Sequence, residues 1–159
     1  ISPESEYLHR KAELKRLVQE LPLGHPVRIV DGDYVPERFY ALAKGLEDLP
    51  ERGLRCQKCI GHRLEETFRI ALQQPERPDY VCTTLTISPH KDAVFINTKG
   101  TELAQQYGIA WLPTDFKKKG GYQRSIVLSR EYDLYRQNFC GCVYSRLEAE
   151  RREKEMASS

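Results

Sequence analysis

Four of the five cysteines stand in two tight pairs, and these are the residues whose spacing best suits chemistry. Cys56 and Cys59 are separated by two residues, which lets two thiolates bind one metal ion or one iron–sulfur cluster. A zinc site or a cubane cluster needs four ligands, so this pair supplies half of such a site. A purely structural role, or a chance spacing, is the alternative.

The second pair, Cys140 and Cys142, is separated by a single glycine. A disulfide across one residue closes a very small ring, which strains the bond and makes it easier to reduce. Glycine permits the unusual backbone dihedral angles that such a ring needs. The spacing therefore favours two-electron redox chemistry. The alternatives are that both thiols bind a metal, or that they never pair.

The remaining cysteine and the histidines carry weaker signals. Cys82 lies in an apolar, β-rich stretch and is predicted to be a small, buried and inert side chain. His62 and His90 lie near the cysteine and serine–proline segments. For each histidine, a surface or capping position is a commoner role than that of a ligand.

One basic loop is a candidate for binding nucleic acid. Its lysines and arginine could contact phosphates and its tyrosine could stack on a base, although an ordinary solvated charge run explains the loop equally well. Aromatic residues that lead into Cys140 could line a pocket beside the thiols, or simply pack on the core. The candidate RNA-contacting residues are Lys117, Lys118, Lys119, Tyr122, Arg124 and Arg136.

Composition limits the remaining possibilities. A chain of 159 residues can bury one hydrophobic core, and a formal net charge of +2 neither requires nor excludes a nucleic-acid partner. No apolar run approaches the roughly 20 residues that span a bilayer, and no signal peptide is visible. The local spacing of the cysteines favours a reducing compartment, so we expect a cytoplasmic protein without a membrane partner.

The hydrophobic pattern predicts helices that alternate with short strands. This alternation is typical of an α/β fold, with a mainly parallel sheet flanked by helices in a single domain over residues 1–145. Residues 146–159 are expected to form a charged C-terminal helix and tail. The expected helices cover about 3–20, 36–44, 56–74, 88–107 and 124–134, followed by one from 144, and the expected strands cover 27–30, 80–85 and 109–112.

The start of the chain suggests that a preceding segment is missing. The sequence opens with Ile1 directly before a helix-start signal and without an initiator methionine. Three strands also make a thin sheet. We therefore expect an N-terminal strand outside this sequence.

Several longer motifs occur in a specific order. They are 55–59 with Arg63 and Leu64, then 83–91, 115–118 and 134–142. This order resembles the cobalamin-independent epoxyqueuosine reductase family of the QueH type, up to about Ser145. The combination is far more specific than either cysteine pair.

The resemblance implies a reaction and a set of roles. It implies the two-electron reduction of the epoxide of epoxyqueuosine to queuosine at the wobble position of tRNA, with electrons from a donor that the sequence does not identify. Cys56 and Cys59 would be ligands of a 4Fe–4S cluster, with a further mononuclear metal ion nearby. Cys140 and Cys142 would be the redox-active pair. The family's two adjacent N-terminal cysteines, the other cluster ligands, are absent from this sequence.

Two other classes of protein compete with this reading. A zinc-stabilised RNA-binding module without catalysis would need both cysteine pairs to converge on one tetrahedral zinc ion. A general thiol–disulfide oxidoreductase would use the C-x-x-C pair as its active dithiol, and the surrounding motifs fit it poorly.

Overall fold

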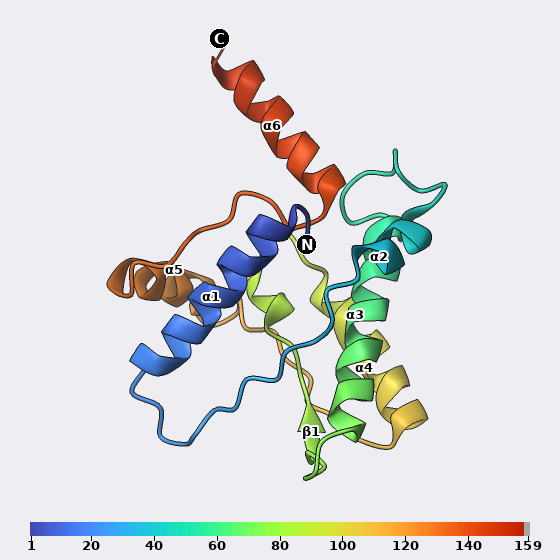
Figure 1. The fold of residues 1–159 in the computed structure, drawn as a ribbon, viewed down its shortest axis with the longest axis vertical. Helices are drawn as coiled ribbons and strands as arrows, with labels where there is room; N and C mark the ends of the chain where they lie inside the picture. Colours follow the sequence, from blue (N-terminus) through green and yellow to red (C-terminus); the bar gives the residue numbers. More distant parts are fainter. Residues whose placement is uncertain (158–159) are drawn as a thin grey trace. The chain divides into compact units, whose positions relative to one another are not determined.

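A computed structural model describes residues 1–157 of the chain (Figure 1). Its contacts group these residues into two compact units, Glu37–Ile126 and a second one formed by Ile1–Pro36 together with the described residues from Val127 onward. The elements in chain order are α1 (Glu4–Glu20), α2 (Pro36–Ala43), α3 (Leu54–Leu72), β1 (Tyr80–Val81), a 3-10 helix (Thr84–Ile87), α4 (Ala93–Tyr107), β2 (Ala110–Trp111), α5 (Gly121–Glu131) and α6 (Val143–Ala157).

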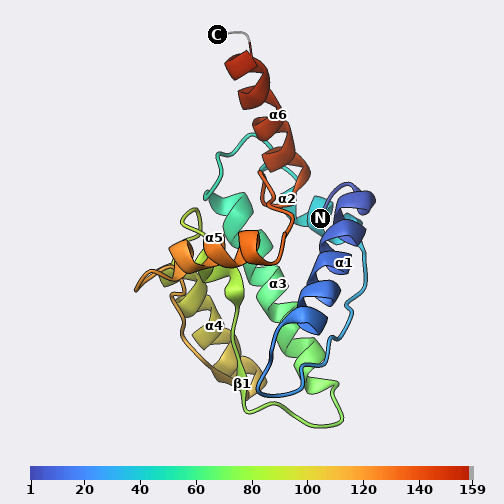
Figure 2. The same cartoon turned by 90° about the vertical axis from the view of Figure 1, so that its left-hand side faces the viewer.

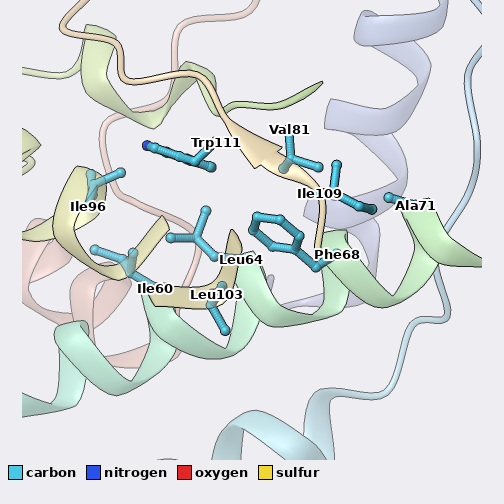
Figure 3. Packing of buried hydrophobic residues seen from close by; sticks show 9 residues of the cluster. All are labelled: Ile60, Leu64, Phe68, Ala71, Val81, Ile96, Leu103, Ile109 and Trp111. Atoms are coloured by element: carbon cyan, nitrogen blue, oxygen red, sulfur yellow. The ribbon is translucent and has the colours of Figure 1, made fainter. Parts of the chain in front are cut away.

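The unit Glu37–Ile126 is built around one apolar core. Helices α3 and α4 pack against each other and against the two strands, as the close view shows (Figure 3). The apolar residues of α3 recur every three or four positions, which places them on one helix face. The core residues are Ile60, Leu64, Phe68, Ala71, Val81, Ile96, Leu103, Ile109 and Trp111.

The two strands confirm the α/β fold class and the parallel sheet. β1 pairs in parallel with β2, with Val81 opposite Trp111, and α4 lies between them in the chain. The described part of the chain is nevertheless rich in helix, because each strand has only two residues. The division into 1–145 and 146–159 stays a prediction, and residues 158–159 of that tail lie outside the described residues.

Two of the expected strands differ in the structure. Residues 27–30 form no strand, because Val27 and Val30 are exposed and have no neighbouring strand to pair with among the described residues. The stretch predicted over 80–85 ends after Val81. Its continuation forms a 3-10 helix. Thr83 is the N-cap of this helix, and its hydroxyl accepts a hydrogen bond from the Leu85 N–H.

Helix α4 begins later than predicted and ends where predicted. Its N-cap is Asp92, whose carboxylate accepts the N–H groups of Val94 and Phe95 at 2.9 and 3.1 Å. Gly108 closes the helix in the left-handed conformation. No helix among residues 1–157 is long and apolar enough to cross a bilayer.

In the other unit, charged residues of α1 hold the segment that leads into α6. Figure 2 shows the ribbon of both elements. The Arg16 guanidinium donates to the carbonyl of Tyr132 at 3.1 Å, and the Glu13 carboxylate accepts the Tyr135 N–H at 2.9 Å. Arg10, on the same helix, donates to backbone carbonyls next to the second cysteine pair. These residues are spaced three apart on α1, so they lie along one side of the helix.

Candidate active site

Cys56 and Cys59 lie at the beginning of α3. Helix α3 follows Gly53, whose backbone is extended, and the Cys56 N–H donates to the Gly53 carbonyl at 3.0 Å. Because the two cysteines are three residues apart in a helix, they lie on the same face. Both are half-buried. The two thiols of the predicted pair therefore lie close together near the N-terminus of α3.

The donor set at this helix fits half of a metal or cluster site. Two thiolates one helical turn apart are suitable ligands for iron or zinc. Within residues 1–157, no group of three or more His, Cys, Asp or Glu side chains is arranged to hold a metal ion. Cys56 and Cys59 thus fit as two of four ligands, and the described residues do not complete the set.

Arg55 fixes the position of this helix start. Its side chain is only 3% exposed, and its Nη1 donates to the carbonyls of Leu46, Glu47 and Leu49 at 3.3, 2.5 and 2.7 Å. These bonds tie the loop before α3 to its first turn. The guanidinium therefore satisfies backbone carbonyls and anchors the segment that carries Cys56.

A pocket of about 420 Å³ opens beside Cys56. It is formed by the beginnings of α3 and α4 and by the segment after β2, so it lies at the carboxyl ends of the parallel strands. Ligands in open α/β sheets bind at this edge. Its polar lining includes Cys56, His90, Lys91, Asp92, Asp115 and Lys117, and does not include Cys59.

Lysines surround one carboxylate in the pocket. Lys117 Nζ lies 3.0 Å from Asp115 Oδ1, and Lys118 Nζ lies 3.4 Å from Asp115 Oδ2. These two lysines, Lys117 above all, hold the pKa of Asp115 below its ordinary value, so this carboxyl is ionised at neutral pH. Lys117 also donates to the Lys91 carbonyl at 3.4 Å. Asp115 and Lys91 were not among the predicted site residues, although each follows a predicted strand and that position was a usable signal.

A buried polar network joins the two segments that follow the strands and lead to the pocket. The Thr86 side chain is fully buried, and its hydroxyl lies 3.1 Å from that of Thr114, which donates to the Thr83 carbonyl at 3.2 Å. The Thr86 oxygen also accepts the Phe116 N–H at 3.3 Å. These bonds join the segment after β1 to the segment after β2. The relative position of the pocket residues on the two segments follows from this network.

The second thiol pair lies in the unit that contains α1 and α6. The Cys140 and Cys142 sulfurs are 3.7 Å apart, whereas a covalent S–S bond would be about 2.05 Å long, so the pair is a dithiol in this structure. Cys142 directly precedes α6 and is 8% exposed, while Cys140 is half-buried. The Ser145 N–H donates to Cys142 Sγ at 3.3 Å, and the Ser145 hydroxyl accepts the Cys140 N–H at 3.1 Å.

Gly141 has the backbone conformation that the spacing predicted. Its φ of 111° is one that side chains rarely adopt, and an added Cβ would lie 3.1 Å from Ile1 and 3.2 Å from Arg10. Arg10 donates to the carbonyls of Phe139 and Cys140 at 3.2 and 3.3 Å. Helix α1 therefore holds the backbone of the cysteine turn in place.

The candidate RNA-contacting residues fall in both units. Lys117 is turned toward Asp115 and Lys91, whereas Lys118 has a side chain that is 75% exposed. Lys119 and Arg124 are also exposed, and Tyr122 is half-buried. Arg136 belongs to the other unit, where it is exposed and donates to the Ser129 hydroxyl at 3.3 Å. Their contact with RNA stays a prediction.

The prediction for Cys82 was wrong, because its side chain is exposed. β1 ends at Val81, whose side chain is 5% exposed and occupies the core face. Successive side chains of a strand alternate between its faces, so the next residue points outward.

The fold and the two cysteine pairs together define a thiol-rich α/β protein. A family model described as "Epoxyqueuosine reductase QueH" matches residues 1–148. The chain therefore belongs to the epoxyqueuosine reductase QueH family, which confirms the resemblance seen in its motifs.

Individual relatives agree with this assignment. An epoxyqueuosine reductase QueH of Streptococcus pyogenes is 41% identical over 147 residues, which cover 91% of this chain and 57% of the relative. One from Staphylococcus epidermidis is 39% identical, with 91% and 62% covered, and one from Thermotoga maritima is 37% identical, with 97% and 78% covered. The chain thus spans about three fifths of the length of the first two of these relatives.

Proposed function

We propose that this chain is the part of a cytoplasmic epoxyqueuosine reductase that carries the C-x-x-C and C-x-C cysteines. The enzyme would remove the epoxide oxygen of epoxyqueuosine at the wobble position of tRNA and leave queuosine. The observation that carries this proposal is the family match over residues 1–148. The relatives named above are called epoxyqueuosine reductases, and the proposal extends their reaction to this chain.

In this proposal, Cys56 and Cys59 are two ligands of a 4Fe–4S cluster. Their common helix face and partial burial support this role. The other two ligands would come from a segment that this sequence does not contain. Once bound, the cluster would supply one-electron transfer, and a further mononuclear metal ion beside it would act as a Lewis acid toward the epoxide oxygen.

The pocket beside Cys56 would hold the modified base. Its volume of about 420 Å³ lies within the range of small-molecule sites, and its polar groups come from three segments. The ionised Asp115 carboxylate can accept hydrogen bonds from hydroxyl or ammonium groups of the base. Lys91 and Lys117 also line the pocket, and their ammonium groups can donate hydrogen bonds.

The Cys140–Cys142 pair would supply the reducing equivalents. Conversion of two thiols into a disulfide releases two electrons and two protons. Removal of an epoxide oxygen as water, with formation of an alkene, consumes the same numbers. Arg10 and Ser145 hold the two cysteines close enough for the bond to form after a small approach.

The exposed basic loop would contact the tRNA backbone. Lys118, Lys119 and Arg124 carry positive charge into solvent, with Tyr122 next to them in the chain. Lys117 would act on the pocket side of the loop, and Arg136 would contribute from the other unit. Contacts of this kind make affinity fall with salt concentration.

The test is conversion of epoxyqueuosine in tRNA by anaerobically purified protein from its complete reading frame, read by mass spectrometry of the nucleosides. We expect loss of one oxygen atom from the base with wild type, and no conversion with Cys56→Ser. Cys82→Ser is the matched control, because Cys82 is exposed and lies outside both pairs. Full activity of the Cys56→Ser variant would exclude the ligand role of Cys56.

Metal content separates this proposal from its rival. About four iron and four sulfide per chain would support the cluster, and an excess of iron would support the further mononuclear ion. About one zinc per chain without sulfide, together with no conversion, would support the zinc-stabilised RNA-binding module instead.

A further inference from the structure

We propose that Cys140 and Cys142 have different tasks when the pair is reduced again after each turnover: an external dithiol attacks Cys140, and Cys142 leaves as the thiolate. The inference rests on the proposed function, since it takes the pair to be redox-active. It adds the chemical class of the electron donor and the order in which the two sulfurs react.

Accessibility selects Cys140 as the attacked sulfur. Thiol–disulfide exchange needs the incoming thiolate to reach one sulfur of the disulfide directly. Cys142 is 8% exposed, whereas Cys140 is half-buried. Arg10 donates to the Cys140 carbonyl, and the Cys140 N–H donates to Ser145 Oγ, so both bonds hold the backbone of this cysteine.

Hydrogen bonding selects Cys142 as the leaving sulfur. Its Sγ accepts the Ser145 N–H at 3.3 Å, at the first turn of the 15-residue helix α6. A helix N-terminus stabilises negative charge, and an N–H donor stabilises it further when the acceptor is ionised. Because a better-stabilised thiolate leaves faster, cleavage with the charge on Cys142 is the favoured direction.

The steps balance. A thiolate of the donor attacks Cys140 Sγ, so a mixed disulfide forms, the Cys140–Cys142 bond breaks, and its electron pair passes to Cys142 Sγ. The donor's second thiol, after losing its proton, attacks the donor sulfur of the mixed disulfide and releases Cys140. The donor leaves as a disulfide, and its two protons end on Cys140 and Cys142.

A trapping experiment tests the assignment directly. The wild-type protein is oxidised with diamide and treated with glutathione, a monothiol that lacks the donor's second thiol, and then alkylated. Peptide fragmentation at Gly141 distinguishes the two cysteines. We expect glutathione on Cys140 and the alkyl group on Cys142, with at least about a tenfold excess over the reverse. Equal labelling, the reverse pattern, or no disulfide after oxidation would overturn the inference.

A pair of substitutions tests the contribution of the Ser145 N–H. Ser145→Ala removes the hydroxyl and keeps the N–H, whereas Ser145→Pro removes both, at a first-turn position where proline is tolerated. We expect dithiothreitol to reduce the oxidised Ser145→Pro variant on the order of tenfold more slowly than Ser145→Ala. Equal rates would overturn the role of the N–H. If the proline variant does not fold, as judged by circular dichroism, the trapping result decides.

The two proposals fail in different ways. Glutathione on Cys140, together with no loss of epoxide oxygen in the tRNA assay, would reject the proposed reaction and leave the order of the sulfurs intact. Epoxide reduction with glutathione on Cys142 would reject only the order.

Discussion

The indole N–H of Trp111 donates a hydrogen bond of 3.0 Å to the side-chain oxygen of Asn97, which joins strand β2 to helix α4. The same Asn97 oxygen accepts the Thr114 N–H at 3.1 Å, and the Asn97 amide donates to the Thr114 carbonyl at 2.9 Å. One side chain on α4 therefore fixes the segment that leads from β2 to Asp115 and Lys117.

Replacement of this asparagine should destabilise the unit Glu37–Ile126. Asn97→Leu leaves the Trp111 N–H and the Thr114 backbone groups without their partner, so we expect the free energy of unfolding to fall by about 2–4 kcal/mol. Urea denaturation followed by tryptophan fluorescence measures the change. Thr98→Ala, at an exposed neighbouring position, should change stability by less than about 0.5 kcal/mol. Similar losses in the two variants would contradict the role of Asn97.

Two helical glycines should respond in opposite directions to the same substitution. A Cβ at Gly100 would collide with the Trp111 ring, whereas a Cβ at Gly61 would meet only the Lys99 side chain, with Cε at 3.6 Å and Cγ at 4.0 Å. Gly61→Ala should stabilise the protein by about 0.5–1 kcal/mol through helix propensity. Gly100→Ala should destabilise it by about 1–3 kcal/mol through overpacking. Thermal unfolding of both variants gives the signs, and stabilisation by both would show that the Trp111 contact is loose.

Charge reversal in the basic loop should weaken binding of tRNA. The double variant Lys118→Glu and Lys119→Glu changes two exposed side chains, and each lost phosphate contact should reduce the slope of log affinity against log salt by about 0.7–0.9. Fluorescence anisotropy with labelled tRNA at several salt concentrations measures the slope.

The control for this experiment is the double variant Arg151→Glu and Arg152→Glu, which makes the same change of net charge on exposed positions of α6. If both double variants lower the affinity and the slope equally, the effect comes from net charge, and the loop is an ordinary solvated charge run.

The acid dependence of stability should report on Glu6. Burial acts to raise the pKa of this carboxyl, but hydrogen bonds from Arg10 at 2.7 Å and Tyr135 at 3.0 Å outweigh it and hold the pKa below the ordinary value. A carboxyl whose pKa is lowered on folding adds stability above its unfolded-state pKa of about 4.3, and this stability is lost as pH falls through the folded-state pKa.

We therefore expect Glu6→Gln to lose less stability than wild type between neutral pH and a pH of about 3. Urea denaturation at the two pH values gives the comparison. Glu4→Gln, at an exposed position in the same helical turn, serves as the control and should keep the wild-type acid loss. An unchanged acid loss in Glu6→Gln would show that the network around Arg10 does not depend on the charge of Glu6.

Local patterns in the sequence were sufficient for most of the helices. The helix predicted over 3–20 is α1, and the predicted end of α4 at Gly108 is correct, because side-chain periodicity and capping are encoded within a few residues. The start of α4 was misplaced at Ser88–Pro89, since the serine–proline signal resembled a cap and the cap that forms is Asp92. The stretch 27–30 looked like a strand, but a strand also needs a paired neighbour, which local sequence does not encode.

By itself, the sequence determined the family, the alternation of helices and strands, and the common helix face of Cys56 and Cys59, because each depends on residue types at short, fixed spacings. Only the tertiary structure decided which groups meet across long distances in the chain. It placed Lys91 and Asp115 on the pocket beside Cys56, set Arg10 against the turn at Cys140, and left Cys82 exposed. The pocket contacts follow from how α3, α4 and the strands bury a shared core, and burial is a property of the packed chain that no single segment carries.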